Sequence, residues 1–140
     1  MASAANDEQM TELVDSLARL LPQLSSSQPP DAAEMRLLLD DPGSALFIAR
    51  LDGVIVGSLT LVLYRIPTGV KAWIEDVVVD DAARGHGIGD ALNRAALDEA
   101  RRRGVKAVSL TSRPSRGAAN RLYQRIGFTI RDTNVYRYDL

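Results

Sequence analysis

VVVDDAARGHGIGD, residues Val77 to Asp90, joins an apolar run to a helix through a glycine-rich turn. The apolar run is typical of a strand buried on both faces in the middle of a sheet. Glycines let backbone N–H groups approach a ligand closely, and the helix N-terminus behind them carries a partial positive charge. The segment therefore predicts an anion site, most naturally for a phosphate or pyrophosphate, with Arg84 as an additional mobile cation.

The glycine pattern alone also fits a tight strand-to-helix turn that binds nothing. It lacks the Gly-Lys-Ser/Thr sequence that grips nucleotide phosphates and magnesium. Nor does it occupy the first turn of a repeating parallel α/β unit, where a dinucleotide fingerprint would stand. We expect the side chain of His86 to face solvent while its backbone takes part in binding.

The spacing of apolar residues on either side of this turn predicts an α+β layered fold. The Asp52-Gly53 pair indicates a tight hairpin, and the unit from Lys71 to Thr111 needs a parallel crossover, so the sheet is mixed and mostly antiparallel, with helices flanking it. The predicted helices are Asp7 to Leu21, a helix from its cap Asp31 to the break at Asp41, Gly87 to Arg103, and a helix capped by Ser115 that ends before Gly127. The predicted strands are Ala45 to Leu51, Val54 to Tyr64, Lys71 to Val79, Val105 to Thr111, and one or two strands from Phe128 to the C-terminus.

Length and composition narrow the classes of protein. A chain of 140 residues with average globular composition predicts one domain, residues 1–140. The absence of cysteine excludes a disulfide scaffold and a thiolate metal site, and a single histidine argues against zinc, so no metal is expected. Because neither a cationic signal start nor a long apolar stretch is present, we expect a soluble cytoplasmic protein.

Charge is divided unevenly along the chain. The formal net charge of −1 argues against a wholly basic surface for nucleic acid. Residues 1–83 contain five Lys and Arg against thirteen Asp and Glu, whereas residues 84–140 contain twelve against five. The basic half begins at Arg84, which favours a focused site for an anionic ligand.

Three motifs between Ile74 and Phe128 are informative together. Arg84, Gly87 and Gly89 fit the pattern Gln/Arg-x-x-Gly-x-Gly/Ala, the run Ile74 to Val79 precedes it, and Ala119 to Phe128 fits Ala-x-x-Leu-Tyr-x-x-x-Gly-Phe. In this order they resemble the motifs of the GNAT superfamily of acetyl-CoA-dependent N-acyltransferases.

The resemblance covers about Ala45 to Leu140 and implies the GNAT fold, with acetyl-CoA bound where two central parallel strands splay apart. It implies that the backbone of Val77, Val78 and Val79 pairs with the pantetheine amides, and that one of these N–H groups polarises the thioester carbonyl. The pyrophosphate would be held by the following loop and helix start, formed by Arg84, Gly85, His86, Gly87, Ile88, Gly89 and Asp90.

Acetyl transfer to an amine needs two proton transfers, because the ammonium must lose a proton and the leaving thiolate must gain one. Tyr123 matches the family's general-acid tyrosine, and a phenol with a pKa of about 10 can protonate a thiolate whose acid has a pKa of about 8.5. Its helical position alone would instead indicate an aromatic side chain that packs under the sheet.

Glu75 and Asp76 are the candidate bases and the candidate acceptor-binding residues. Neighbouring residues of a strand point to opposite faces, so only one of them can readily look into the acceptor cleft. The Ile-Glu-Asp-Val run resembles that of glucosamine 6-phosphate N-acetyltransferases, which favours Glu75 acting through water. The alternative is that one or both carboxylates pair with nearby arginines.

Two features depart from the family pattern. The position seven residues before Tyr123, often a cofactor-binding Asn, is Arg116, and Asn120 one turn later is a candidate substitute. Arg116 and Arg113 could bind the 3′-phosphate of the cofactor or lie on a solvated surface. Only Met1 to Asn6 are available for the family's first strand, which is therefore short or missing.

The sequence thus predicts an N-acetyltransferase in which a primary amine attacks acetyl-CoA directly in a ternary complex, because no cysteine could carry an acyl group. The acceptor, a small-molecule or peptide amine, would be shaped by the first two helices, the loop Leu24 to Pro30 and the turn Arg65 to Val70, none of which has a diagnostic motif. A non-catalytic acetyl-CoA-binding regulatory or interaction module is the alternative. No nucleic-acid or membrane partner is expected, and exposed strand edges leave room for a homodimer.

Overall fold

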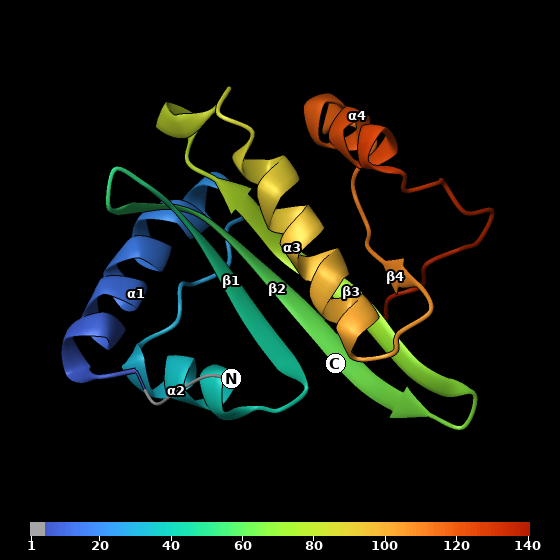
Figure 1. The fold of residues 1–140 in the computed structure, drawn as a ribbon, viewed down its shortest axis with the longest axis horizontal. Coiled ribbons are helices and arrows are strands. Elements are labelled where there is room, and N and C mark those ends of the chain that lie inside the picture. The colour runs from blue at the N-terminus through green and yellow to red at the C-terminus, as the bar shows by residue number, and fades with distance from the viewer. Residues whose placement is uncertain (1–4) are drawn as a thin grey trace.

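A four-stranded sheet in the order β1-β2-β3-β4 forms the middle layer of the computed structural model, which describes residues 5–140. α1 and α2 cover one face of this sheet and α3 covers the other (Figure 1), so the expected α+β layered fold is confirmed. The strands are β1 (Ser44–Leu51), β2 (Val54–Ile66), β3 (Gly69–Val79) and β4 (Val108–Ser109). The helices are α1 (Asp7–Leu20), α2 (Ala32–Asp40), α3 (Ile88–Arg102) and α4 (Gly117–Ile126), with short 3-10 turns at η1 (Leu21–Gln23) and η2 (Asp81–Ala83).

The antiparallel part of the sheet is built from two hairpins. Asp52 and Gly53 take positive φ angles of 53° and 81°, and β1 pairs with β2 across them, as the sequence predicts. β2 pairs with β3 on its other side, so it has a partner along both of its edges. Leu59 and Leu61 of β2 are fully buried beneath α3, and each such burial stabilises the fold by about 1.5–3 kcal/mol.

Side-chain caps determine where α1 and α2 begin. The Asn6 side chain accepts a hydrogen bond from the Gln9 N–H at 2.8 Å, and the Gln9 side chain accepts one from the Asn6 N–H at 3.1 Å. Asp31 caps α2 as predicted, accepting from the Glu34 N–H at 2.9 Å. α1 ends one residue earlier than expected because Pro22 has no N–H to continue the α-helical pattern.

The parallel pair is short and splayed. α3 crosses from β3 to β4 and ends before Gly104, which has a φ of 78°. β4 pairs with β3 only through Val108 and Ser109, while β3 continues to Val79 without a β4 partner. The predicted strand from Val105 to Thr111 is therefore reduced to two residues, because beyond Ser109 the chain leaves the edge of β3.

The predicted strands after Phe128 are wrong, since residues 128–140 contain no strand. A strand needs a neighbour with which to exchange backbone hydrogen bonds, and β4 has a ladder of only two residues. Apolar side chains of this segment are consequently exposed, namely Ile130, Val135, Tyr136, Tyr138 and Leu140.

The predicted cap of α4 is also wrong. Arg116, not Ser115, is the N-cap, because the Arg116 N–H donates to the Arg113 carbonyl oxygen at 3.0 Å and closes a turn that contains Ser115. Gly127 ends the helix with a φ of 125°, as expected. Of the possible first strand, residues 1–4 lie outside the described part of the chain, and Ala5 and Asn6 form no strand. No helix within residues 5–140 is both long and apolar enough to cross a membrane.

Candidate active site

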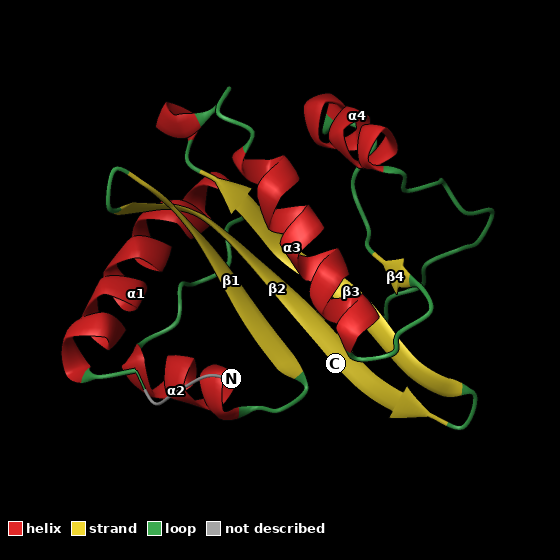
Figure 2. Cartoon of the chain, viewed as in Figure 1, coloured by secondary structure: helices red, strands yellow, loops and turns green. Residues whose placement is uncertain are grey.

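A cavity of about 590 Å³ lies between two walls at the end of β3, and its size suits a small-molecule ligand. The loop wall runs from the end of β3 through η2 to the start of α3, and the α4 wall consists of α4 and the turn before it (Figure 2). Gln23 of η1 lines the cavity as well. The loop wall contributes Val77, Val78, Val79, Ala83, Arg84, Gly85, Gly87, Ile88, Gly89 and Asp90, and the α4 wall contributes Ser115, Arg116, Gly117, Ala118, Ala119, Leu122, Tyr123 and Arg125.

The structure brings together every residue predicted to bind the cofactor except His86 and Asn120. His86 is exposed, as expected, and its Nδ1 lies 3.0 Å from the Ala83 carbonyl oxygen. Asn120 donates to the Arg113 carbonyl oxygen at 3.0 Å, so it fixes the turn before α4 rather than lining the cavity. Glu75 and Asp76 also lie outside the cavity lining.

The loop wall offers backbone donors at the start of α3. Gly85 and Gly87 have φ angles of 85° and 71°, a left-handed backbone conformation that residues with a Cβ rarely adopt. Gly87 is the N-cap of α3, and no side chain caps the first turn of this 15-residue helix. The N–H groups of that turn and the positive end of the helix dipole are thus available to an anion, as the sequence predicts.

The charged side chains around the cavity are mostly basic. Arg84, Arg116 and Arg125 line it, and Asp90 is the one carboxylate among the lining residues. Asp90 is neutralised by Arg94, whose Nε lies 2.7 Å from its Oδ1. The described cavity is therefore electropositive and suited to a ligand with several phosphate charges.

A β-bulge interrupts β3 beside the candidate bases. Thr60 of β2 pairs with Glu75, while Ser58 pairs with Val78, so two residues of β3 oppose one residue of β2. Asp76 takes a φ of 51°, a left-handed value. The alternation that was expected to send Glu75 and Asp76 to opposite faces is therefore wrong here, since it assumes a regular strand.

Both carboxylates at this bulge are exposed, and neither forms an ion pair with a Lys or Arg of residues 5–140. The alternative that they serve as partners of nearby arginines is thus not what the structure shows. Partial burial, followed by the negative charge of Asp76, raises the pKa of Glu75 above its ordinary value. A raised pKa makes this carboxylate a stronger base than a free glutamate.

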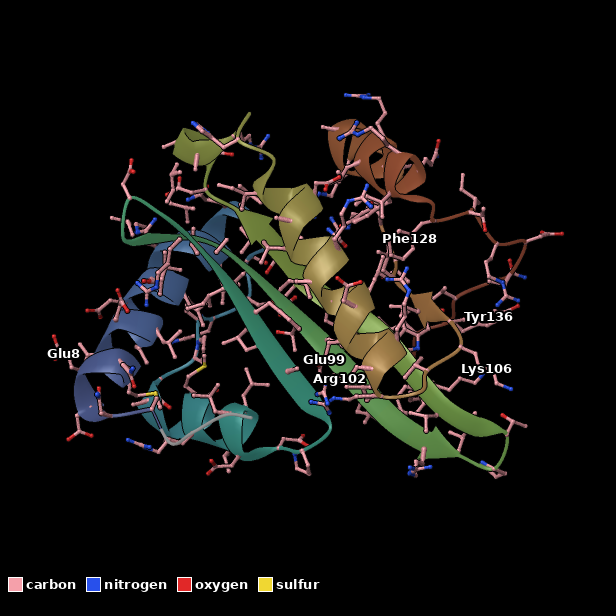
Figure 3. The ribbon with its side chains drawn as sticks, in the orientation of Figure 1. Glu8, Glu99, Arg102, Lys106, Phe128 and Tyr136 are labelled. Atoms are coloured by element: carbon pink, nitrogen blue, oxygen red, sulfur yellow. The ribbon has the colours of Figure 1, made fainter. Side chains whose placement is uncertain are left out.

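Tyr123 faces the cavity from α4 while also packing against the fold. Its ring meets that of Phe128, which is labelled in Figure 3, edge to face with centroids 5.8 Å apart. Tyr123 is therefore both a packed aromatic and a residue that lines the cavity. Burial raises the pKa of the Tyr123 phenol, and the positive charge of Arg116 partly opposes this effect. The phenol therefore keeps its proton at neutral pH.

Some lining residues carry no signal in the sequence. Gln23 reaches the cavity from η1, far along the chain from both walls, and its spacing has no relation to the motifs. Leu122, in contrast, is the Leu of the Ala-x-x-Leu-Tyr motif, and it packs closely, because a Cβ on Gly89 would lie 2.9 Å from Leu122 Cδ2. Arg125 follows Tyr123 by two positions on α4 and could have been found only by knowing which face of α4 meets the cavity.

The sheet, its splayed parallel pair and the glycine-rich helix start together define the acetyltransferase fold. Residues 10–128 match the family described as "Acetyltransferase (GNAT) family", and the chain belongs to this family. A mycothiol acetyltransferase of Beutenbergia cavernae is 37% identical over 78 residues, which make up 56% of this chain and 25% of that protein. The chain thus spans about a quarter of the length of this curated relative.

Two solved structures share the fold over almost the whole chain. A transcriptional regulator from Bacillus halodurans C-125 superposes with a TM-score of 0.76 at 26% identity, covering 96% of each chain. The structure of AAC(6')-Iy in complex with the bisubstrate analogue CoA-S-monomethyl-acetylneamine gives a TM-score of 0.78 at 19% identity, covering 97% of this chain and 95% of that one. These superpositions confirm the GNAT fold.

Proposed function

We propose that the chain transfers an acetyl group from acetyl-CoA to a primary amine of a small molecule or peptide. The observation that carries this proposal is the cavity that unites a helix N-terminus, three arginines and a half-buried tyrosine. Membership of the acetyltransferase family supports the reaction class. A bisubstrate CoA analogue bound in a structure of the same fold supports the identity of the donor.

The residues present fit coenzyme A. The N–H groups around Gly85, Gly87 and Gly89, together with Arg84, would hold the pyrophosphate, and Arg116 is available to a further phosphate. The backbone of Val77 to Val79, which β4 leaves unpaired, would hold the amide-bearing arm. Acetyl-CoA supplies the thioester, and the residues of this chain orient it and move the protons.

Tyr123 is proposed as the general acid. As the amine nitrogen bonds to the carbonyl carbon and the C–S bond breaks, the Tyr123 hydroxyl gives its proton to the leaving sulfur and later regains one from solvent. Its raised pKa ensures that the phenol still holds this proton when the thiolate forms. A protonated phenol in a partly desolvated site is suited to this task.

Glu75 is proposed as the base, acting through water, and Asp76 as a neighbouring acceptor-binding group. An alkylammonium with a pKa of about 10 must lose a proton before its nitrogen can attack. The raised pKa of Glu75 brings it nearer to neutral pH, and its lack of an ion-pair partner among the described residues leaves it free to accept the proton. Transfer is direct, because the sequence contains no cysteine that could form an acyl-enzyme thioester.

The test follows release of free thiol when the protein is mixed with acetyl-CoA and a panel of primary amines. We expect release that depends on both the protein and the amine. Binding of CoA is measured in parallel by calorimetry. Silence across a broad panel, with CoA demonstrably bound, would contradict catalysis.

A non-catalytic acetyl-CoA-binding regulatory module is the second candidate, favoured by one observation. The structure described as a transcriptional regulator is 26% identical and shares the fold over 96% of this chain. Such a module would be stabilised by acetyl-CoA against heat but would show no amine-dependent thiol release.

We also propose that residues 1–140 act as one cytoplasmic domain that can form a homodimer. The free outer edges of β1 and β4 support self-association, as do the exposed apolar residues near the C-terminus. Light scattering across a concentration series gives the oligomeric state.

A further inference from the structure

The beginning of the loop wall is attached to α1 by side chains that the proposed chemistry does not use. Arg19, in the last turn of α1, donates from Nη1 to Asp80 Oδ2 at 2.6 Å and from Nη2 to the Ile55 carbonyl oxygen at 2.7 Å. One guanidinium therefore joins α1, β2 and the residue that follows β3. The Asp80 side chain is only 17% exposed, so this ion pair is better shielded from water than the Arg84–Asp81 pair of the same loop.

Asp80 in turn shapes the turn η2. Its N–H donates to the Val56 carbonyl oxygen at 2.7 Å, and its Oδ1 accepts from the Ala82 N–H at 3.1 Å. The first residue of the loop is thus fixed on both its backbone and its side chain. Since η2 leads directly to Arg84, the position of Asp80 sets where the rest of the loop begins.

Gln23 of η1 also holds the loop, and it lines the cavity. Its Oε1 accepts from the Asp81 N–H at 2.9 Å, and of the described lining residues it is the one that precedes β3. Asp81 Oδ1 lies 2.8 Å from Arg84 Nη2. A continuous series of contacts therefore runs from Gln23 through Asp81 to the cation at the mouth of the anion site.

We propose that Arg19, Gln23 and Asp80 form a latch of positioning residues, which holds the loop and Arg84 ready for the pyrophosphate. The inference rests on the proposed function, because it concerns the binding of the same cofactor. A loop whose geometry exists before binding does not have to be ordered by the ligand, so more of the contact energy appears as affinity. The latch therefore acts on the pyrophosphate end of the cofactor and not on the arm along β3.

The test compares the affinity of the latch variants for CoA and for pantetheine, which lacks the pyrophosphate. Gln23→Met keeps the length of the side chain and removes its hydrogen bonds. Loss of one such bond should raise the Kd for CoA about 3–10-fold and leave the Kd for pantetheine unchanged. Gln28→Met is the matched control, because Gln28 is an exposed glutamine of the same connection that does not line the cavity, and it should change neither Kd.

Arg19→Met and its conservative partner Arg19→Lys provide a second measurement. Lysine keeps the charge but cannot donate to Asp80 and Ile55 with the same fork, so it should restore part of the CoA affinity lost in the methionine variant. With acetyl-CoA as substrate, KM should rise far more than kcat falls. If Arg19→Met does not fold, Gln23→Met still decides the question, since Gln23 is exposed.

The outcomes separate the latch from the proposed function. A wild-type chain that binds no CoA overturns the proposed function itself. A wild-type chain that binds CoA together with a Gln23→Met variant of equal affinity overturns the latch alone. Equal weakening of CoA and pantetheine also overturns it, because the effect would then be a general disturbance of the fold.

Discussion

The two walls of the cavity are held in different ways. Hydrogen bonds from the Asp80 N–H to the Val56 carbonyl oxygen and from the Asp81 N–H to Gln23 attach the loop wall to distant parts of the fold. α4 contains no buried residue. Side-chain packing holds this helix in place: Leu122 packs against Gly89, and the Tyr123 ring packs against the Phe128 ring.

We infer from this difference that pyrophosphate binding depends on the loop wall and protonation of the leaving thiolate on the α4 wall. Fixed backbone donors are what an anion requires, because they need no reorganisation when the ligand arrives. A helix with few buried contacts opens and shifts more easily, which allows a general acid to follow a departing sulfur. Substitutions in the loop wall should then act mainly on affinity for CoA, and loss of the Tyr123 hydroxyl in the α4 wall mainly on turnover.

Tyr123→Phe should give the largest effect, a fall in kcat of about 10³-fold with the Kd for CoA unchanged. The reason is that the variant keeps the ring and loses only the proton donor. Steady-state kinetics and calorimetry supply the two numbers. Tyr138→Phe, at an exposed tyrosine outside the cavity, is the control. Equal losses in kcat and affinity for Tyr123→Phe would show that the walls share one task.

Glu75→Gln should lower kcat/KM about 100-fold, less than the tyrosine variant because water can still carry protons. The wild-type rate should fall on the acid side at a pH above the usual range of glutamate, since the pKa of Glu75 is raised and its charged form is the base. That limb of the pH profile should disappear in the variant, whereas Glu34→Gln on α2 should retain it. A pH profile unchanged by Glu75→Gln would remove this residue from the mechanism.

The same substitution has a stability consequence of defined sign. A folded-state pKa that is raised favours the folded protein below the unfolded pKa, and this advantage is lost as the pH rises through the folded value. At neutral pH the charged carboxylate therefore disfavours folding slightly. Denaturant titrations should show Glu75→Gln to be somewhat more stable than wild type at neutral pH.

Gly87→Ala should weaken CoA binding about 10-fold, because a Cβ at a φ of 71° introduces strain of about 1–2 kcal/mol in the turn that carries the anion donors. Gly104→Ala is the matched control, at a φ of 78° beyond the other end of α3. Both variants should lose similar stability on heating, and only Gly87→Ala should lose affinity. Equal affinities for the two would contradict the role assigned to the loop wall.

Gly89→Ala tests how firmly α4 is seated. The new Cβ would meet Leu122 Cδ2 at 2.9 Å, and this atom is the end of a flexible side chain. If α4 can shift slightly, the overpacking is readily relieved, and the free energy of unfolding should change by less than about 1 kcal/mol. The Kd for CoA should then change only about 2–3-fold. A loss of several kcal/mol in denaturant titration would show that the α4 wall is as firmly held as the loop wall.

Glu99→Gln should give the smallest effect. Glu99 lies away from both walls, near the C-terminal end of α3 (Figure 3). Hydrogen bonds from Arg102 and Arg103 lower the pKa of Glu99 to about 2. Its stabilisation is thus present above the ordinary glutamate pKa and is lost as the pH falls from about 4.5 toward 2. Because the group is on the surface, we expect a loss of only about 0.5 kcal/mol at neutral pH, with no change in CoA affinity.

Local features of this fold could be predicted from the sequence. The Asp52-Gly53 hairpin and the Gly87 start of α3 follow from the backbone angles that these residues permit, and the cap Asp31 follows from the chemistry of one side chain. That the glycine-rich loop and Tyr123 line one cavity could also be predicted, because each belongs to a motif that resembles those of the GNAT family. Each of these features is decided within a few residues along the chain.

Features that depend on distant partners could not be predicted. The alternating residues after Phe128 have strand character, yet a strand forms only where an edge accepts it, and β4 is too short. The bulge at Asp76 arises because Thr60 pairs with Glu75 while Ser58 pairs with Val78, and no residue type in the sequence indicates this register. The contact between Gln23 and Asp81 joins positions 58 residues apart, beyond the reach of any spacing argument.

The splay between β3 and β4 determines which substitutions at Val77 to Val79 the protein would tolerate. The peptide groups of Val77 to Val79 on the β4 side have no strand beside them, so an amide-bearing ligand can add to the sheet there as a surrogate strand. Recognition of this kind reads main-chain geometry and ignores side-chain identity. Replacement of one β-branched residue by another along this edge should therefore leave the position of the bound ligand unaltered. A proline would remove a backbone N–H donor and so prevent the ligand from pairing there.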